Sequence, residues 1–181
     1  MQNSLQYNDF VQFLSTRQYD RMDSPHSYQN RLNVSVKFTI FSIREIKSKA
    51  KTFQIVLDTL ITWTDPRLTN SSNKTDSLRL FEPEKHIWVP SMIIVNNIKK
   101  TKAEFLLSKS DFTYVYPSGK VKNWEISDYM ISSKMNLLYF PFDTQCLFVD
   151  VGAISSDRLH LFEGGISCRG VKKCDNLDID G

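Results

Sequence analysis

Tyr139-Phe140-Pro141-Phe142-Asp143-Thr144-Gln145 is the stretch of the sequence that decides the fold. A proline between two phenylalanines fixes the backbone of a tight turn, and both rings can hold that turn against a second surface. We therefore predict a contact-making loop at this point of the chain. Asp143 is expected to accept hydrogen bonds from backbone N–H groups or to pair with a nearby base.

Three other motifs precede this turn. The first is Trp63-Thr64-Asp65-Pro66-Arg67-Leu68, and the second is Ile87-Trp88-Val89-Pro90. The third is a hairpin in which Tyr114, Tyr116 and Gly119 come before Trp124. In this order, the four motifs resemble those of the extracellular domains of the Cys-loop, or pentameric ligand-gated ion channel, receptors over about residues 8 to 160.

The resemblance implies an immunoglobulin-like antiparallel β-sandwich with a short N-terminal helix. It implies one domain over residues 1–181, with the helix at about 4–17, the sandwich at about 32–160 and a variable loop at 161–181. In the family two more strands would follow, so we expect the domain to be incomplete at its C-terminus. The implied coupling and structural positions are Phe140, Pro141, Phe142, Asp143, Trp63, Asp65, Trp88 and Pro90.

The residue pattern alone predicts a compatible architecture. Residues 4–17 carry apolar side chains among polar ones, which fits a short amphipathic helix. Val34, Val36 and Phe38 alternate with polar residues, and this period of two is typical of a half-buried strand. Many short strands without long helices between them indicate an antiparallel β-sandwich. Further strands are predicted at residues 53–63, 91–98, 112–116, 125–132 and 146–151.

The resemblance also implies where a ligand would bind. The first ligand-contacting loop falls on Val95 and Asn96, and the second falls on Ile154 and Ser155. In the family, aromatic side chains at such positions hold an ammonium group through cation–π contacts. Because Val95 and Ile154 stand where rings would be, we expect this face to bind amines poorly.

The opposite face of the implied site also lacks an aromatic residue that the family often has. The strand position that often carries an aromatic residue there falls near Asp58. Tyr114 and Tyr116 lie at alternate positions of a predicted strand. They either pack on the sheet or line this complementary face.

The cysteines depart from the family pattern. The two cysteines that give the family its name fall on Ser133 and Leu147, so that disulfide bond cannot form. We expect packing of Leu147 and the two phenylalanines of the turn to hold the loop instead. Cys168 and Cys174 frame five residues, and they either close a small disulfide in an oxidising compartment or remain free thiols.

Three Asn-x-Ser/Thr sequences begin at Asn33, Asn70 and Asn73. As glycosylation acceptors they would fit an extracellular surface, although such triplets also arise by chance in a chain rich in Asn and Ser. Asn70 and Asn73 lie in a polar, turn-forming stretch, which suits a glycan better than the strand around Asn33.

Composition and charge exclude other classes of function. A net charge of +3, from 23 basic and 20 acidic residues, is too balanced for a nucleic-acid-binding protein. The sequence has no Gly-rich phosphate loop and no nucleophile-elbow serine. Its three histidines are far apart. We therefore predict no enzyme activity, no metal site and no cofactor.

Three functions are compatible with the sequence. The first is the extracellular domain of a channel subunit, which binds a small molecule between homologous subunits of a pentamer and couples binding to a transmembrane pore absent from this chain. The second is a secreted, pore-less binding protein, and the third is an accessory fragment without a ligand. The sequence carries no leader and no run of about twenty apolar residues. We therefore expect this chain to be an incomplete gene model, an expressed piece or a divergent relative of such a receptor. The full-length receptor subunit would lie on the extracellular face of the plasma membrane.

Overall fold

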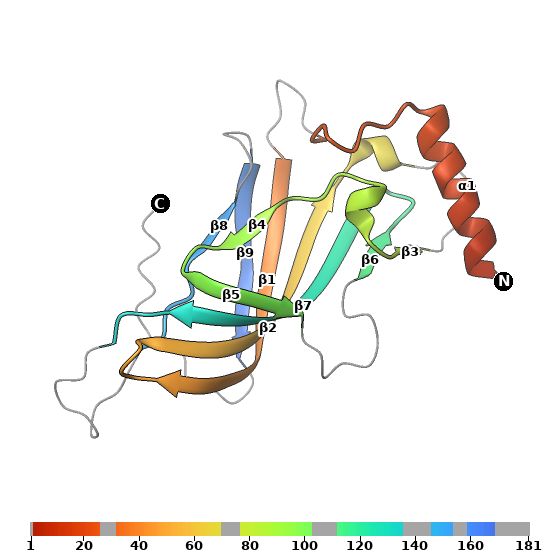
Figure 1. Cartoon of the computed structure of the whole chain (residues 1–181). Helices are drawn as coiled ribbons and strands as arrows, with labels where there is room; N and C mark the ends of the chain where they lie inside the picture. The colour runs from red at the N-terminus through yellow and green to blue at the C-terminus, as the bar shows by residue number, and fades with distance from the viewer. Residues whose placement is uncertain are drawn as a thin grey trace.

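The computed structural model describes residues 2–25, 32–69, 77–102, 112–135, 146–153 and 159–168. Strands dominate this part of the chain, and one short helix precedes them, which confirms the predicted all-β fold (Figure 1). The elements are α1 (Gln2–Thr16), β1 (Leu32–Lys47), β2 (Thr52–Thr64), η1 (Pro66–Leu68), β3 (Leu78–Leu80), η2 (Pro83–Lys85), β4 (Met92–Ile94), β5 (Asn97–Lys102), β6 (Phe112–Val115), β7 (Lys120–Ser132), β8 (Val151–Ala153) and β9 (Leu159–Cys168).

The main sheet has the strand order β3-β6-β7-β2-β1-β9. Its centre is the pair β2–β7, which runs without a break from Thr52 opposite Ser132 to Thr64 opposite Lys120. β6 pairs with the first half of β7 and β5 with the second half. Apart from β1–β9, every pair described in this sheet is antiparallel.

A second, two-stranded sheet is formed by β4 and β8. β4 lines a cavity together with residues of β1, β2 and β7, so the small sheet covers one side of the main sheet. We call this covered side the inner face and the other side the outer face. Asn123 and Glu125 line the cavity, and Trp124 between them therefore points to the outer face.

Two hydrophobic clusters lie on the inner face. The first surrounds Trp63, which is 1% exposed, and the second surrounds Phe53, also 1% exposed. Both residues belong to β2, ten residues apart, so at about 3.3 Å per residue they lie about 33 Å apart along the strand and the two clusters occupy its two halves. The first includes Val34, Val36, Ile61, Leu68, Leu80, Ile87, Trp88, Val115 and Val121, and the second includes Ile55, Leu57, Tyr129, Ile131 and Met135.

β9 differs from the sequence expectation of a variable loop from residue 161. The backbone of Leu159–Cys168 forms a strand parallel to β1, on the edge of β1 that β2 leaves unpaired. Between Val36 and Phe38 the register shifts, and two glycines, Gly164 and Gly165, oppose one residue of β1. Alternation of side chains carries no information on strand direction, so the sequence could not predict a parallel partner.

α1 packs at the end of the main sheet beside β3, as Figure 1 shows. Its apolar side chains Phe10, Phe13 and Leu14 contact the first hydrophobic cluster. The hydroxyl of Tyr7 lies 2.9 Å from Nε2 of His86 and adds a polar contact. The predicted helix is thus confirmed and has a partner surface. Within the described residues, no helix is long and apolar enough to cross a membrane.

Candidate functional site

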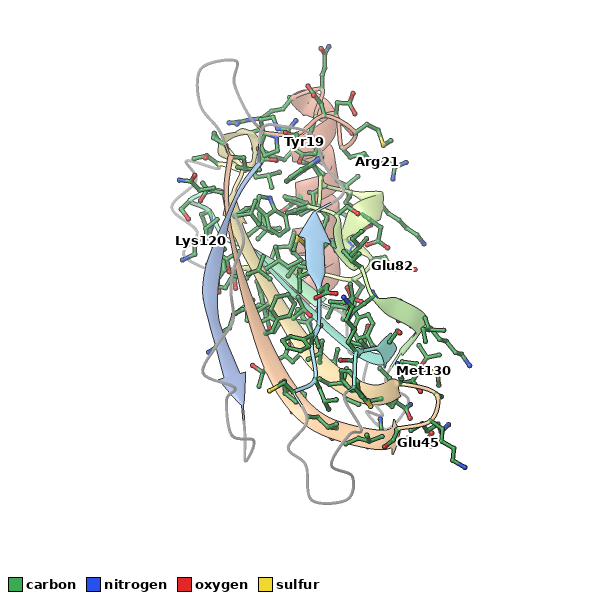
Figure 2. All side chains as sticks on the ribbon, turned by 90° about the vertical axis from the view of Figure 1, so that its left-hand side faces the viewer. Tyr19, Arg21, Glu45, Glu82, Lys120 and Met130 are labelled. Atoms are coloured by element: carbon green, nitrogen blue, oxygen red, sulfur yellow. The ribbon has the colours of Figure 1, made fainter. Side chains whose placement is uncertain are left out.

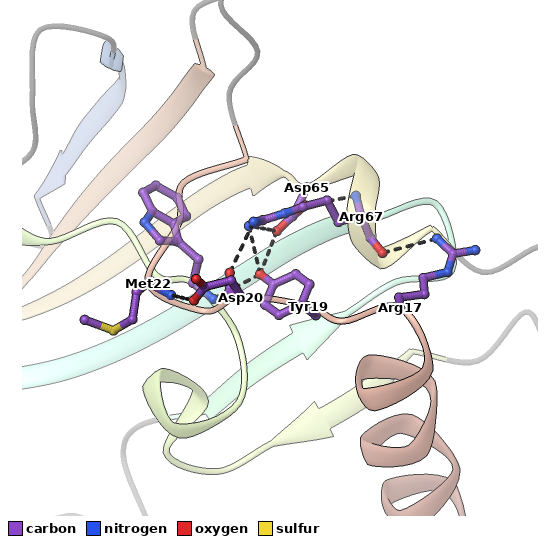
Figure 3. Close-up of polar contacts among 7 residues, drawn as sticks. Arg17, Tyr19, Asp20, Met22, Asp65 and Arg67 are labelled. Atoms are coloured by element: carbon purple, nitrogen blue, oxygen red, sulfur yellow. Dashed lines mark hydrogen bonds and ion pairs between the residues drawn. The ribbon is translucent and has the colours of Figure 1, made fainter.

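A polar network forms around Asp65, where the chain leaves β2 (Figure 3). The Asp65 carboxylate is fully buried. It accepts hydrogen bonds from the Tyr19 hydroxyl at 2.7 Å and from the Arg67 guanidinium at 2.8 and 3.0 Å. It also accepts from the Arg67 backbone N–H at 3.0 Å and so caps η1, in which Pro66 occupies the first turn.

Tyr19 connects the segment after α1 to this network. Its hydroxyl accepts a hydrogen bond from the Trp88 backbone N–H at 3.1 Å, and the Arg67 guanidinium lies 4.4 Å from the centre of its ring. Burial raises the pKa of Tyr19, and the neighbouring Asp65 raises it further, so the phenol remains a hydrogen-bond donor at neutral pH. Burial lowers the pKa of Arg67, but the hydrogen bonds and charge of Asp65 outweigh this and raise it.

Other residues of the sequence motifs pack or form hydrogen bonds next to this network. Trp63 and Trp88 pack edge to face with ring centres 6.2 Å apart, and Pro90 is buried. The carbonyl of Gly119 accepts from the Asp65 N–H at 2.9 Å, and a Cβ atom at Gly119 would lie 2.5 Å from the Asp65 carbonyl oxygen. With a φ of +79°, this turn position therefore requires glycine.

Val95 and Asn96, the first predicted ligand loop, form the corner where the chain passes from β4 in the small sheet to β5 in the main sheet. Val95 is 62% exposed. The Asn96 side chain donates to the carbonyls of Ser132 and Phe148 and accepts from the Asp150 N–H, each at 3.0 Å. Asn96 is therefore engaged in holding three segments together.

Ser133 stands where the family has one cysteine of its disulfide. Its hydroxyl accepts a hydrogen bond from the Phe148 N–H at 3.2 Å, and Phe148 directly follows the position of the second cysteine, Leu147. Leu147 itself packs against the second hydrophobic cluster. A neutral hydrogen bond and packing thus join the two ends of the loop that the disulfide would close.

Three aromatic rings gather on the outer face, on β6 and β7. Phe112 and Trp124 stack with ring centres 5.3 Å apart, and Tyr114 meets both rings edge-on at 5.6 and 5.7 Å. All three are half-buried. They form an aromatic platform on the side of the main sheet that the small sheet does not cover.

Two cations of the chain lie against this platform. The Arg79 guanidinium is 4.6 Å from the Phe112 ring centre, and Lys122 Nζ is 5.6 and 6.0 Å from those of Tyr116 and Trp124. Arg79 pairs across the strands with Tyr114, which pairs with Lys122. The cations therefore flank Tyr114 in one row of the sheet. Sequence analysis missed both, although the alternation of Tyr114 and Tyr116, and of Lys122 and Trp124, indicated a common face.

Asp58 lies on the same outer face, farther along β2. It is opposite Ile126, whereas Trp124 is opposite Leu60. Burial raises the pKa of Asp58, while the charge of Lys37 opposes this effect. One carboxylate oxygen is buried without a hydrogen-bond partner. The predicted ligand positions Asp58, Tyr114 and Tyr116 thus share one face, and Val95 and Asn96, also predicted, lie at the corner with the small sheet on the other side.

The inner face holds a cavity of about 340 Å³ between the two hydrophobic clusters. Its apolar wall includes Phe38, Ile61 and Met92. Its polar wall includes Glu125, which forms an ion pair with Lys100 and accepts from the Ser127 hydroxyl at 2.7 Å. Within the described residues, no group of three or more His, Cys, Asp or Glu side chains could hold a metal ion.

Several predicted positions lie outside the described residues. These are the turn Phe140–Asp143, the second ligand loop at Ile154 and Ser155, the acceptors Asn70 and Asn73, and Cys174. Asn33 lies in β1, where its side chain is exposed. Of Cys168 only the backbone, at the end of β9, is described.

Comparison with known proteins agrees with the motifs. The sequence model of the neurotransmitter-gated ion-channel ligand binding domain matches residues 8–157. Acetylcholine receptor subunit gamma of Gallus gallus is 27% identical over 115 residues, which are 63% of this chain and 22% of that protein. Neuronal acetylcholine receptor subunit beta-4 of Homo sapiens is 27% identical over 136 residues, 73% of this chain and 26% of that protein.

A third relative shows a shorter but closer match. Acetylcholine receptor subunit beta-like 2 of Drosophila melanogaster is 36% identical over 76 residues, 41% of this chain and 14% of that protein. The chain thus spans about a quarter or less of the length of these relatives. The family comprises ligand-gated ion channels rather than enzymes, which confirms the prediction that this chain is not an enzyme. The chain belongs to the neurotransmitter-gated ion-channel ligand-binding domain family and is homologous to acetylcholine receptor subunits.

Proposed function

We propose that this chain is the extracellular ligand-binding domain of a pentameric ligand-gated ion channel subunit at the plasma membrane. It binds a small molecule between neighbouring subunits and couples this binding to a transmembrane pore. The proposal combines the family match with the arrangement of the predicted ligand positions in the sandwich.

The observation that carries the proposal is the division of these positions between two surfaces. Tyr114 and Asp58 lie on the outer face of the main sheet, and Val95 lies at the corner with the small sheet, which covers the inner face. Within one chain these positions are far apart, because Tyr114 pairs with Lys122 near the start of β7, whereas Asn97, two residues after Val95, pairs with Ile131 near its end. A site that contains both therefore needs two chains, in a head-to-tail contact that repeats around a ring.

The outer-face platform is suited to form one wall of such a site. Phe112, Tyr114 and Trp124 present a fixed aromatic surface on paired strands. Rings held by regular structure contact a ligand at a low cost in conformational entropy. The neighbouring subunit would contribute the corner at Val95.

Coupling to the pore is assigned to the turn Phe140–Asp143, on its sequence. In a full-length subunit, Phe142→Ala should leave ligand binding intact and reduce the currents. Binding of a labelled ligand and recording of currents from the same cells separate these two effects. Normal currents from the variant would remove the coupling role from this turn.

The proposal as a whole is tested by expressing the full-length subunit, alone and with candidate partner subunits, and recording currents while small ligands are applied. Tyr114→Ala should raise the ligand concentration for half-maximal current by at least about fivefold, as loss of a well-packed interface ring does. Phe41→Ala is the matched control, since Phe41 is 44% exposed and lies on β1, away from the platform.

Surface labelling shows whether each variant reaches the membrane. A subunit that reaches the surface with its partners and gives no ligand-dependent current would contradict the channel role. Equal effects of Tyr114→Ala and Phe41→Ala would leave the channel role intact and remove the platform from the ligand site.

A further inference from the structure

Arg79 and Lys122 already lie over two of the three rings of the aromatic platform, Phe112 and Trp124. A cation binds an aromatic ring over its face, where the quadrupole is negative. Arg79 lies over Phe112, and Lys122 lies near the faces of Tyr116 and Trp124. An incoming ammonium group would therefore meet two positive charges at the surface that should attract it.

The positions of Arg79 and Lys122 on the platform favour binding of a negatively charged group. Arg79 and Lys122 stand on either side of Tyr114, on strands that are two spacings apart, or about 10 Å between backbones. Their side chains are held by the rings, which reduces the entropy lost when they contact a ligand. Neither forms an ion pair with a carboxylate within the described part of the chain.

Among the residues that the structure describes, the surrounding charges do not cancel this positive potential. Lys37 and Lys120, both exposed, add positive charge at the edges of the region. Asp58, on the outer face of β2, is two residues away along that strand from Leu60, which lies opposite Trp124. Its charge interacts with Lys37. Asp128 is farther along β7 and is paired with Arg44 at 2.7 Å.

We infer that the outer-face platform binds a small organic anion, a carboxylate on an aromatic or aliphatic body, rather than an amine. The carboxylate lies between Arg79 and Lys122, and the apolar body rests on the edges of Phe112, Tyr114 and Trp124. This inference deepens the proposed function, because it names the class of ligand for the wall that this chain supplies.

Two probes of similar shape and opposite charge test the inference on the purified chain. Benzoate and benzyltrimethylammonium are titrated separately at equal ionic strength, and the indole N–H signal of Trp124 is followed by NMR and assigned with Trp124→Phe. Trp63 and Trp88 are buried, so Trp124 is the reporter for the surface. Benzoate should bind at least about fivefold more tightly than benzyltrimethylammonium, and added salt should weaken it.

Charge variants decide whether the two cations are responsible. Arg79→Gln combined with Lys122→Gln should abolish the preference for benzoate, whereas Arg79→Lys should retain it. Lys49→Gln is the matched control, because Lys49 is exposed in the turn after β1 at the other end of the molecule. Tighter binding of benzyltrimethylammonium to the unmodified chain, or a benzoate preference that survives in the double variant, would overturn the inference.

These results are independent of the channel experiment, since neither a pore nor a second subunit is needed. Binding of benzoate without any current from the full-length subunit would contradict the proposed function alone. Currents that depend on Tyr114 but are evoked only by amines would contradict the further inference alone.

Discussion

The two ends of the sandwich are held together by different kinds of hydrogen bond (Figure 2). At the end near Tyr19 the acceptor is a buried carboxylate, whereas at the end near Glu45 and Met130 the side-chain groups are a neutral amide and a hydroxyl. The first end has the Asp65 network and the second has Asn96 and Ser133. Hydrogen bonds to a buried charge are roughly twice as strong as neutral ones. The first end should therefore be the firmer anchor, and the second end should open more easily.

The difference agrees with what each end has to hold. The Asp65 network fixes the segment after α1, η1 and the backbone at Trp88 relative to one another. The contacts of Asn96 hold residues 148–150, which lead to β8 and the small sheet. Weaker contacts at the second end permit local rearrangement at a smaller cost in free energy.

Replacing Asp65 should have the largest effect. Asp65→Asn removes the charge that pairs with Arg67 and weakens the contact to Tyr19, and loss of one partner of a buried pair costs about 3 kcal/mol. Urea unfolding measures the change. Glu45→Gln is the control, since its pair with Lys47 is exposed and should contribute less than about 0.5 kcal/mol. Equal effects of both variants would show that the first end is not a stronger anchor.

Asn96→Ala should have an intermediate effect. It removes three hydrogen bonds at a half-buried position, where water replaces part of them, so we expect a loss of about 1–2 kcal/mol. The Asp150 amide should also exchange its hydrogen faster. Ser132→Ala is the control, because Ser132 offers Asn96 only its backbone and its side chain is exposed. Unchanged exchange at Asp150 would contradict the role of Asn96 as the holding residue.

Ser133→Ala should cost about 1 kcal/mol. The variant leaves the Phe148 N–H without its acceptor, while the backbone bond from Ser133 N–H to the Lys51 carbonyl remains. Chemical denaturation compares it with Ser132→Ala, which should be close to neutral. A loss as large as that of Asp65→Asn would reverse the ranking of the two ends.

Asp58→Asn should have the smallest effect and the opposite sign. Burial raises the pKa of Asp58 above its unfolded value of about 3.9, so its stabilising contribution is complete below that pH and is lost as the pH rises through the folded pKa. At pH 7 the variant should therefore be more stable by about 0.5 kcal/mol. This gain should disappear near pH 3, and thermal unfolding at both pH values checks it.

Asp150→Asn serves as the control for that comparison. Asp150 is exposed at the second end, so removing its charge should leave the pH dependence of stability unchanged. If Asp58→Asn instead destabilises the chain at pH 7, the attraction of Asp58 to Lys37 outweighs the cost of burying its charge, and the expected sign is wrong.

Much of the fold followed from local sequence. The alternation at Val34, Val36 and Phe38 placed β1 correctly, because a strand with one buried face imposes a period of two on its side chains. Trp63 and Trp88, from two of the quoted motifs, are both buried, and Asp65 in the first of these motifs caps the next turn. These features depend on residues close together in the chain.

The candidate site was only partly predictable. Tyr114 and Asp58 came from the resemblance, and the structure has both on the outer face. Sequence reasoning did not find Arg79, which comes from β3 and reaches Phe112 only because β3 pairs with β6. Likewise Asn96 was expected to face a ligand, but its hydrogen bonds go to β7 and to residues 148–150.

The sequence by itself determined the strand pattern, the glycine at the turn before β7 and membership of the receptor family. Each of these features depends on particular residue types at short or fixed spacing in the chain. Tertiary structure alone decided that β9 runs parallel to β1, that Asn96 holds three segments, and that Arg79 and Lys122 flank Tyr114. The physical reason is that local patterns set which side chains are buried, whereas the choice of strand partner is made by contacts between residues distant in the chain.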